Sequence, residues 1–326
     1  LTRRLGFGDA LIEKARGRFL RSVIKSENID LVCSHSPRSD INCKEAVEKL
    51  SVPLVMIEHG IYSHYLFKKR KHLLKPLLSA TEIVAVSDFC NKQMKSYIGA
   101  AAEVTTIYNG VEIEAPHSRA QVRKELGIGD GDIAFGFAAR GRPKKGWQPA
   151  IDAFLKLKEE RKEKTHLILV GGGHYVKELQ EEYKNHKEIH FIGKVSNPAY
   201  YIDAVDVGLM LSTYQTEALS LIAIEFLMLG KPVIATNVGG VPEVFQTCDD
   251  SMYQLIDLKE DGSVDTGKLK DVMLSFTRQE KSLALDKAQV EPVLRKFSMD
   301  TCVQAYESLF QRMVHNKKQD PSQLIQ

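Results

Sequence analysis

A basic loop is the first feature whose residue types could do chemistry. Residues 137–147 read FAARGRPKKGW, and four of the six residues from Arg140 to Lys145 are cations. Like charges so close together repel one another unless an anion neutralises them, and a departing nucleotide diphosphate would be such an anion. The alternative is a set of solvated loop charges, because composition does not tell which cations point inward. The loop therefore indicates a candidate anion-binding site.

Two carboxylates accompany an apolar stretch at residues 212–232, STYQTEALSLIAIEFLMLGKP. Glu225 interrupts a predicted helix that is apolar almost all round. Burying it is costly unless it finds donors, and a ribose diol would supply two. Glu217 precedes this helix, whose free N–H groups would favour a diphosphate, and the small Ala218 and Ser220 would let phosphate oxygens approach the backbone. The alternatives are an internal cation for Glu225 and a helix-capping role for Glu217.

The elements that must position these residues are predicted from the apolar pattern. Short β-branched runs alternate with helical patterns along nearly the whole chain, which is typical of an α/β fold with parallel sheets. Four strands are predicted in the first part and six in the second. They lie at residues 30–33, 53–57, 82–86 and 104–107, and at 133–138, 166–170, 189–192, 207–211, 232–235 and 252–256.

A connection that contains proline and acidic residues, 109–116, separates the two parts and leads into a helix with Ser118 as its predicted N-cap. Because open parallel sheets bind ligands beyond the carboxyl ends of their strands, we expect the site in a cleft between the parts. Helices are predicted at 268–276 and 298–314, followed by a frayed polar tail at 316–326. The predicted domains are residues 1–112, 113–300, and a C-terminal helix and tail at 301–326.

Composition excludes a disordered, a collagen-like and an integral membrane protein. The chain has 326 residues, 43% hydrophobic and 27% charged, and no apolar run approaches the roughly 20 residues that span a bilayer. Its five scattered cysteines form no CxxC pair, which favours free thiols in a reducing compartment and a cytoplasmic protein. The triplet Asp130-Gly131-Asp132 precedes a predicted strand and fits turn geometry better than a metal site.

Positive charge is concentrated in the first part of the chain. Residues 1–110 carry 17 Lys and Arg against 11 Asp and Glu. At residues 66–75 the cations alternate with Leu and Phe at near-helical spacing, which is compatible with a helix on an anionic membrane surface. The alternative is a solvated helix whose leucines face its own core, and nucleic acid is not expected because the basic residues match no motif of the usual nucleic-acid-binding modules. The cations concerned are Lys68, Lys69, Arg70, Lys71 and Lys75.

In order and spacing, the motifs of the second part resemble the donor half of retaining glycosyltransferase family 4, which has the GT-B fold of two Rossmann-like domains facing a cleft. Upstream segments resemble the family's first domain and interdomain junction, so that the likeness covers about residues 28–314. The motifs are Arg140 followed by Lys145-Gly146, the glycines 171–173, Glu217 with Glu225, GKPVIA at 230–235, GGVPE at 239–243, Glu58-His59-Gly60, Val86-Ser87 and IYNGV at 107–111.

The resemblance implies roles for these residues in a metal-independent, cofactor-free hexosyl transfer. Arg140 and Lys145 would absorb the charge of the leaving diphosphate. Glu217 would position the sugar hydroxyls or stabilise the developing positive charge, and Glu225 would hold the ribose. His59 would face the sugar from the first domain, or else be a loop histidine bonded to backbone. Further predicted donor-binding residues are Gly171, Gly172, Ala218, Leu219, Ser220 and Leu221.

The sequence also departs from the family pattern. Ala218 and Ser220 stand where the family has glycine, and Phe226 stands where it has alanine. We therefore expect a tighter phosphate pocket. The family's first domain begins with additional βα units that have no counterpart here, which predicts a truncated or reduced first domain.

The function predicted from the sequence is glycosyl transfer in bacterial polysaccharide or glycoconjugate synthesis. The expected donor is a nucleotide sugar, more specifically a UDP-sugar, and the expected acceptor is a saccharide or a lipid-linked acceptor. The protein would act in the cytoplasm or at the inner face of the membrane. The alternatives are a sugar-nucleotide epimerase of the same fold and a nucleotide-sugar-binding module without activity.

Overall fold

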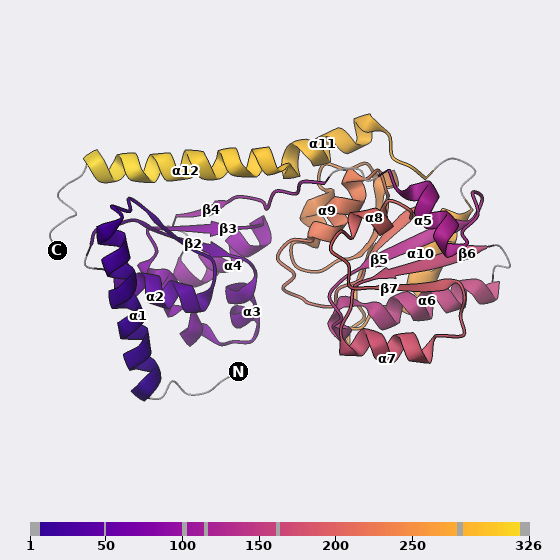
Figure 1. The fold of residues 1–326 in the computed structure, drawn as a ribbon, viewed down its shortest axis with the longest axis horizontal. Coiled ribbons are helices and arrows are strands. Elements are labelled where there is room, and N and C mark those ends of the chain that lie inside the picture. Colours follow the sequence, from indigo (N-terminus) through magenta and orange to yellow (C-terminus); the bar gives the residue numbers. More distant parts are fainter. Residues whose placement is uncertain are drawn as a thin grey trace. The chain divides into compact units, whose positions relative to one another are not determined.

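The computed structural model describes residues 7–48, 50–99, 103–113, 117–160, 164–278 and 283–319. The chain forms two compact units, one of Leu1–Asn109 with Asp300–Gln326 and one of Gly110–Met299. Each unit contains its own parallel sheet with helices around it, which confirms the α/β fold (Figure 1). The segment from Asp300 onward, which we expected to be a helix and tail of its own, groups with the first unit.

The first unit is built on a four-stranded sheet in the order β1-β2-β3-β4, with all neighbours parallel. All four predicted strands are confirmed, with ends shifted by at most two residues. The strands are β1 (Val32–Ser34), β2 (Leu54–Glu58), β3 (Glu82–Ala85) and β4 (Val104–Thr106). Its helices are α1 (Phe7–Ser26), α2 (Pro37–Val47), α3 (Ile61–Phe67), the 3₁₀ helix η1 (Lys71–Ser79) and α4 (Asp88–Ile98), together with α12 (Met299–Gln319).

The second unit is built on a six-stranded parallel sheet in the order β10-β9-β8-β5-β6-β7, and its six predicted strands are confirmed. They are β5 (Ile133–Ala138), β6 (Thr165–Val170), β7 (Ile189–Gly193), β8 (Val207–Met210), β9 (Val233–Thr236) and β10 (Tyr253–Ile256). Its α-helices are α5 (Arg119–Leu126), α6 (Trp147–Glu160), α7 (His174–Glu182), α8 (Ala199–Ile202), α9 (Leu221–Met228), α10 (Thr266–Thr277) and α11 (Lys287–Phe297); its 3₁₀ helices are η2 (Pro143–Lys145), η3 (Val241–Phe245) and η4 (Asp250–Met252).

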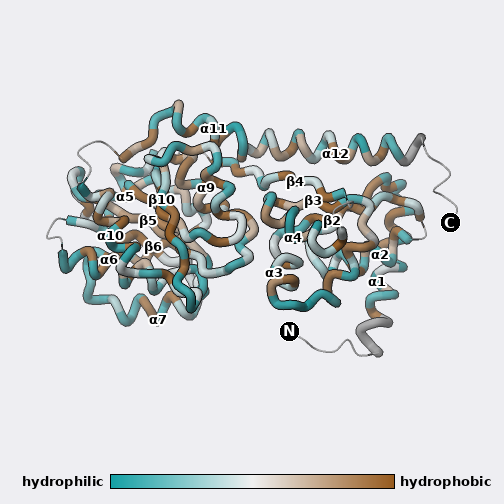
Figure 2. Tube along the Cα trace, turned by 180° about the vertical axis from the view of Figure 1, so that it is seen from behind, coloured by the Kyte–Doolittle hydropathy of each residue, from teal (hydrophilic) through white to brown (hydrophobic). Residues whose placement is uncertain are grey.

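The central strands of the second unit are buried on both faces. A parallel strand covered by helices on both faces reads as a continuous apolar run, as β6 and β8 do here, and every residue of these two strands is buried. Figure 2 shows the corresponding hydrophobic segments along β5 and β6. The Trp147 ring at the start of α6 packs edge-on against Phe137 of β5, with ring centroids 5.0 Å apart. This packing fixes α6 at the end of β5, where the basic loop lies.

The basic stretch at residues 66–75 does not form one helix, contrary to expectation. Helix α3 ends at Phe67 and η1 begins at Lys71, because Lys69 adopts a left-handed conformation with φ 55° between them. In η1, Leu74 and Leu77 are buried, which agrees with the alternative that leucines of this stretch face the protein's own core. Phe67 is nevertheless 52% exposed and Leu78 is 66% exposed.

Three further details differ from the sequence-based expectation. Helix α11 was not predicted, and α12 extends to Gln319, so that residues 316–319 are helical and not frayed; residues 320–326 lie outside the described residues. Ser118 does precede α5, but its side chain does not cap the helix. Instead, the carboxylate of Asp203 accepts hydrogen bonds from the backbone N–H groups of Ser118 and Arg119 at 2.9 and 3.0 Å.

None of the helices in the described part of the chain combines the length and the apolar character that a bilayer crossing requires.

Candidate active site

Three loops of the second unit follow adjacent strands. The basic loop follows β5, the glycine turn at 171–173 follows β6, and residues 211–220 follow β8. Because β5 lies between β8 and β6 and all three strands run parallel, these loops meet at the carboxyl edge of one sheet. All the predicted site residues of the second part come from these loops and from α9, which follows the third of them.

Two glycines allow the loops to pack closely. Gly171 has φ 133°, and a Cβ atom there would clash with the carbonyl oxygen of Ala139. Gly146 has φ 97°, and a Cβ atom there would clash with the carbonyl oxygen of Leu211. Both glycines are therefore required by backbone conformation and by close approach. They hold the basic loop against the loops on either side of it.

The smaller of two cavities at this edge has a volume of about 270 Å³. At its rim the Lys145 ammonium group donates to both carboxylate oxygens of Glu217, with Nζ–Oε1 and Nζ–Oε2 distances of 2.9 and 2.7 Å. The Ser212 hydroxyl donates to Glu217 Oε2 at 2.6 Å. Each side chain of the ion pair is only 16% exposed. The predicted residues that line this cavity are Arg140, Lys145, Glu217, Leu219, Ser220 and Leu221.

The structure shows which anion lies beside Lys145 and whether Glu217 caps a helix, two points that the sequence left open. The anion beside Lys145 in this structure is the Glu217 carboxylate, so the basic loop is partly neutralised from within the chain. Glu217 does not cap the helix either, because α9 begins at Leu221 and the Ser220 hydroxyl, as its N-cap, accepts from the backbone N–H of Ala223 at 3.4 Å. The α9 amino terminus lines the same cavity through Ser220 and Leu221.

Arg140 is held by its backbone while its side chain stays exposed. The indole N–H of Trp147 donates to the Arg140 carbonyl oxygen at 3.0 Å. The guanidinium group makes no hydrogen bond or ion pair with the described residues, and the residue lines both cavities. Arg140 is therefore available to an anion that spans the two cavities.

The larger cavity has a volume of about 660 Å³ and contains Glu225. The Glu225 carboxylate is half-buried and has no hydrogen-bond partner or counter-ion among the described residues. Burial raises its pKa. The internal cation that was the alternative for Glu225 is thus absent from the described part of the chain. The predicted residues that line this cavity are Arg140, Gly171, Gly172, Leu221 and Glu225.

The two cavities adjoin. Their linings share Arg140 and the amino terminus of α9 at Leu221 and Ile222. A ligand that occupied both would place its middle between a free guanidinium group and free helix N–H groups. One end of it would lie at the Lys145–Glu217 pair and the other at Glu225.

Two expected features of this site differ in the structure. Ala218 lines neither cavity. Phe226 does not narrow the phosphate pocket, because its fully buried ring packs against Gly208 of β8, where a Cβ atom would clash with the ring. The large side chain is accommodated by a glycine in the sheet and lines neither cavity.

His59 lies in the first unit, directly after β2. The preceding Glu58 is buried, and its carboxylate accepts hydrogen bonds from the backbone N–H groups of Tyr62 and Ser63 at 3.1 and 2.8 Å. Gly60, with φ 94°, makes the turn into α3. These hydrogen bonds connect the end of β2 to the start of α3 on either side of His59. His59 therefore lies at the carboxyl edge of the first sheet.

Within the described ranges, the His59 ring makes no hydrogen bond to backbone, in contrast to the alternative reading. Its Nε2 atom lies 3.1 Å from Nδ1 of His35, and the two rings stack with centroids 5.4 Å apart. Partial desolvation of the ring, with a smaller contribution from His35, lowers the pKa of His59, although the residue as a whole is exposed to solvent. The lower pKa favours the neutral imidazole near physiological pH.

Several residues at the site were missed by sequence reasoning. Ser212 bonds Glu217, and the Tyr214 ring lies 5.5 Å from Lys145 Nζ. Arg142 and Lys194 line the larger cavity. Arg142 was one of the four cations of the basic loop, but their crowding did not tell which of them points inward. Ser212 stood inside a segment already singled out but belongs to no motif, so the sequence carried no signal for its role.

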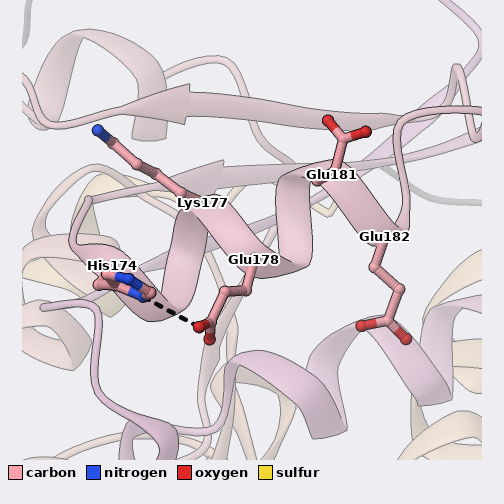
Figure 3. A pocket seen from close by; sticks show the side chains of 5 residues that line it. All are labelled: His174, Lys177, Glu178, Glu181 and Glu182. Atoms are coloured by element: carbon pink, nitrogen blue, oxygen red, sulfur yellow. Dashed lines mark ion pairs between the residues drawn. The ribbon is translucent and has the colours of Figure 1, made fainter.

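A third hollow lies along α7, the helix that follows the glycine turn (Figure 3). His174 and Glu178 form an ion pair of 3.0 Å on its exposed face, and no predicted site residue lines it. Among the residues that the structure describes, no group of three or more His, Cys, Asp or Glu could hold a metal ion. None of the five cysteines, all of which lie among the described residues, forms a disulfide bond.

Two family models match the chain: Glycosyltransferase Family 4 over residues 2–115 and Glycosyl transferases group 1 over residues 118–249. The chain is 25% identical over 310 residues to N-acetyl-alpha-D-glucosaminyl L-malate synthase of Bacillus anthracis, covering 92% of this chain and 79% of that protein. It is 28% identical over 228 residues to alpha-monoglucosyldiacylglycerol synthase of Streptococcus pneumoniae, covering 63% and 50%.

Among solved structures, the fold is similar to that of Anabaena Alr3699/HepE in complex with UDP and glucose. The TM-score is 0.74 at 20% sequence identity, and the match covers 95% of this chain and 83% of that one.

Proposed function

The chain belongs to glycosyltransferase family 4 and is a glycosyltransferase of the GT-B fold, and from this premise we propose that it moves a hexosyl group from a nucleotide sugar to a saccharide or lipid-linked acceptor. We propose a UDP-sugar as donor and retention of the anomeric configuration. The HepE structure, which contains UDP and glucose, supports the choice of nucleotide.

The observation that carries this proposal is the pair of adjoining cavities with Arg140 between them. The nucleoside would lie in the larger cavity, where the two hydroxyl groups of a ribose would give the unpartnered Glu225 carboxylate the donors it lacks. The diphosphate would lie against Arg140 and the N–H groups at the start of α9. The sugar would then reach the smaller cavity, beside Glu217.

Transfer breaks the bond between the anomeric carbon and the diphosphate oxygen, so negative charge grows on the diphosphate and positive charge on the sugar. Arg140 and Lys145 would stabilise the first, and the Glu217 carboxylate would stabilise the second or hold the sugar hydroxyls. In this scheme Glu217 forms no covalent bond to the sugar. Because Arg140 lines both cavities and Lys145 lines the smaller one, we propose that these two cations make a divalent metal unnecessary.

We also propose that the first unit contacts an anionic membrane surface while it receives a lipid-linked acceptor. The exposed Phe67 and Leu78 flank the cations of the basic stretch, which gives an apolar and basic surface of the kind that lies in a lipid interface. The relative in Streptococcus pneumoniae, by its name, synthesises a glucosyl lipid.

The experiment that tests the proposed function is a thermal-shift screen against nucleotides and nucleotide sugars, followed by incubation of the stabilising donor with and without EDTA. Stabilisation by a UDP-sugar over its GDP and ADP counterparts is expected, because a ligand that binds only the folded state raises its melting temperature. Product analysis then separates the alternatives. A glycoside or slow hydrolysis with release of UDP supports transfer, whereas an epimerised donor, or binding with no turnover, contradicts it.

A further inference from the structure

Two histidines stand side by side at the carboxyl edge of the first sheet. His35 follows β1 and His59 follows β2, and these strands are paired in parallel with Ser34 opposite Met56. The rings are within 18° of parallel, and His35 Nδ1 lies 3.1 Å from His59 Nε2. At this distance a single hydrogen lies between the two nitrogens, because two N–H groups would repel and two lone pairs would form no bond.

A third group decides on which nitrogen that hydrogen resides. Cys33 Sγ lies 3.7 Å from His35 Nε2. Burial raises the pKa of the Cys33 thiol to about 11, so the sulfur keeps its hydrogen at neutral pH. A thiol is a weak donor, and its sulfur is a weaker acceptor than an imidazole lone pair. The favoured arrangement therefore has the S–H directed at an unprotonated His35 Nε2.

The positions of the remaining ring hydrogens follow from the chemistry of neutral imidazole, in which one ring nitrogen carries a hydrogen and the other a lone pair. With its Nε2 unprotonated, His35 carries its hydrogen on Nδ1 and donates it to His59 Nε2. His59 must then carry its own hydrogen on Nδ1. That atom has no hydrogen-bond partner in the part of the chain that the structure describes.

We propose that His35 is a positioning residue, which fixes His59 as the neutral tautomer that presents Nδ1–H to a hydroxyl or ether oxygen of the bound sugar. A neutral donor suits that place, since an imidazolium ion would repel the positive charge that develops on the sugar. The Cys33 thiol donates to His35 Nε2, and His35 in turn donates from Nδ1 to His59 Nε2. This inference rests on the proposed function only in taking the ligand of His59 to be the sugar.

The tautomer can be measured without any activity assay. In protein labelled with ¹⁵N-histidine, two-bond ¹H–¹⁵N correlation spectra distinguish protonated from unprotonated ring nitrogens, and the His59→Gln variant assigns the His59 signals. We expect His59 to carry its hydrogen on Nδ1 in the wild-type protein. We expect the same in His35→Asn, whose amide can donate from nearly the position of Nδ1. In His35→Asp the carboxylate only accepts, so His59 should move its hydrogen to Nε2.

Transfer kinetics provide the second readout. We expect His35→Asp to lower kcat by about tenfold or more, as for loss of one hydrogen bond in the transition state, with KM little changed, and His35→Asn to restore most of it. A merely structural His35 would not distinguish these two variants. The matched control is His190→Asn in the second unit, which removes one ring of a similar stacked pair, His166–His190, outside the candidate site. Its kcat should equal that of the wild-type protein.

Two outcomes would overturn the inference: an Nε2–H tautomer of His59 in the wild-type protein, or an unchanged His59 tautomer in His35→Asp. Thermal unfolding of each variant shows whether it is folded, and if His35→Asp does not fold, the wild-type and His35→Asn spectra still decide. The proposed role of His59 is tested separately. A His59→Ala variant with unchanged transfer would refute that role while leaving the measured tautomer as it stands.

Discussion

The two glutamates of the candidate site differ in how their charge is satisfied. Glu217 accepts three hydrogen bonds, two from Lys145 and one from Ser212. Glu225 accepts none from the described residues, although it lies half-buried in an apolar helix. A half-buried carboxylate without donors destabilises the free protein, and it persists where a ligand provides them. We therefore expect loss of the Glu225 charge to stabilise the free protein and loss of the Glu217 charge, which breaks the ion pair with Lys145, to destabilise it.

Glu225→Gln should make the free protein more stable and the nucleotide complex weaker. Because the folded-state pKa of Glu225 is raised, the folded protein binds more protons than the unfolded chain above the usual carboxyl pKa of about 4.3, so its contribution to stability falls as pH rises. We therefore expect the variant's advantage in melting temperature to be absent near pH 4 and present at pH 7. Loss of a charged acceptor for ribose should weaken UDP binding by roughly tenfold or more.

Calorimetry with UDP and thermal unfolding across pH measure both effects. The control is Glu159→Gln, an exposed residue of α6 that lines neither cavity, for which neither quantity should change. A variant that binds UDP as tightly as the wild-type protein would remove Glu225 from the binding site.

Arg140→Ala should lower kcat on the order of a hundredfold, because a preorganised charge that stabilises the leaving group is lost. Lys144 belongs to the same loop but lines neither cavity, and its ammonium group lies 5.7 Å from the Tyr214 ring. Lys144→Ala is therefore the matched control and should change kcat by less than about twofold. Steady-state transfer rates of the two folded variants decide, and equal rates would reject the role of Arg140.

At the scale of elements, the site depends on how closely three loops approach one another. The glycine turn after β6 touches the start of the basic loop, and the backbone N–H of Ala139 donates to the Val170 carbonyl at 3.0 Å. Side chains on these loops can share a ligand only if the backbones stay at this spacing. This close spacing requires glycine at position 171, because its φ of 133° is disfavoured for any other residue.

Gly171→Ala should lower the free energy of unfolding by about 1–3 kcal/mol, from backbone strain and the contact with Ala139. It should also weaken UDP binding, because the loops must separate. Gly131→Ala is the control: a Cβ atom there meets no atom within 4 Å. Chemical denaturation of the two variants is the measurement, and a Gly171→Ala protein as stable as Gly131→Ala would show that the turn does not need glycine.

At the scale of the whole molecule, the two units carry opposite net charge. By sequence, the unit of residues 1–109 and 300–326 has 20 Lys and Arg against 14 Asp and Glu, whereas residues 110–299 have 25 against 28. The basic stretch accounts for much of the surplus. Net charge of this kind bears on association with charged surfaces and does not determine the fold.

Replacing Lys68, Lys69, Arg70 and Lys71 with glutamine should abolish binding to anionic vesicles, because each cation near an anionic surface contributes about 1 kcal/mol. Wild-type protein should float with vesicles that contain phosphatidylglycerol, less so at high salt, and should not float with phosphatidylcholine alone. Lys177 on α7 and Lys184 in the turn after it, both in the second unit, are the control positions for glutamine substitution. Flotation that is indifferent to lipid charge would contradict the membrane proposal.

The sequence alone determined the ten strands and the α/β fold, because a buried parallel strand requires only a short apolar run and its turns require local glycine, proline or polar residues. It also located the basic loop, the glycine turn, Glu217 and Glu225, since these stand in recognisable order along the chain. Its failures at this scale were local: it predicted one continuous helix where α3 ends and η1 begins, and it missed α11, whose interior Pro292 argues against a helix.

Only the tertiary structure decided which charges meet. Lys145 and Glu217 are 72 residues apart, and their pairing depends on β5 and β8 being neighbours in the sheet. The lack of a partner for Glu225, the packing of Phe226 on Gly208 and the His35–His59 contact are likewise matters of spacing between elements. Hydrogen bonds and ion pairs act over a few ångströms, and such distances between residues far apart in the chain are fixed only when the sheets and helices pack.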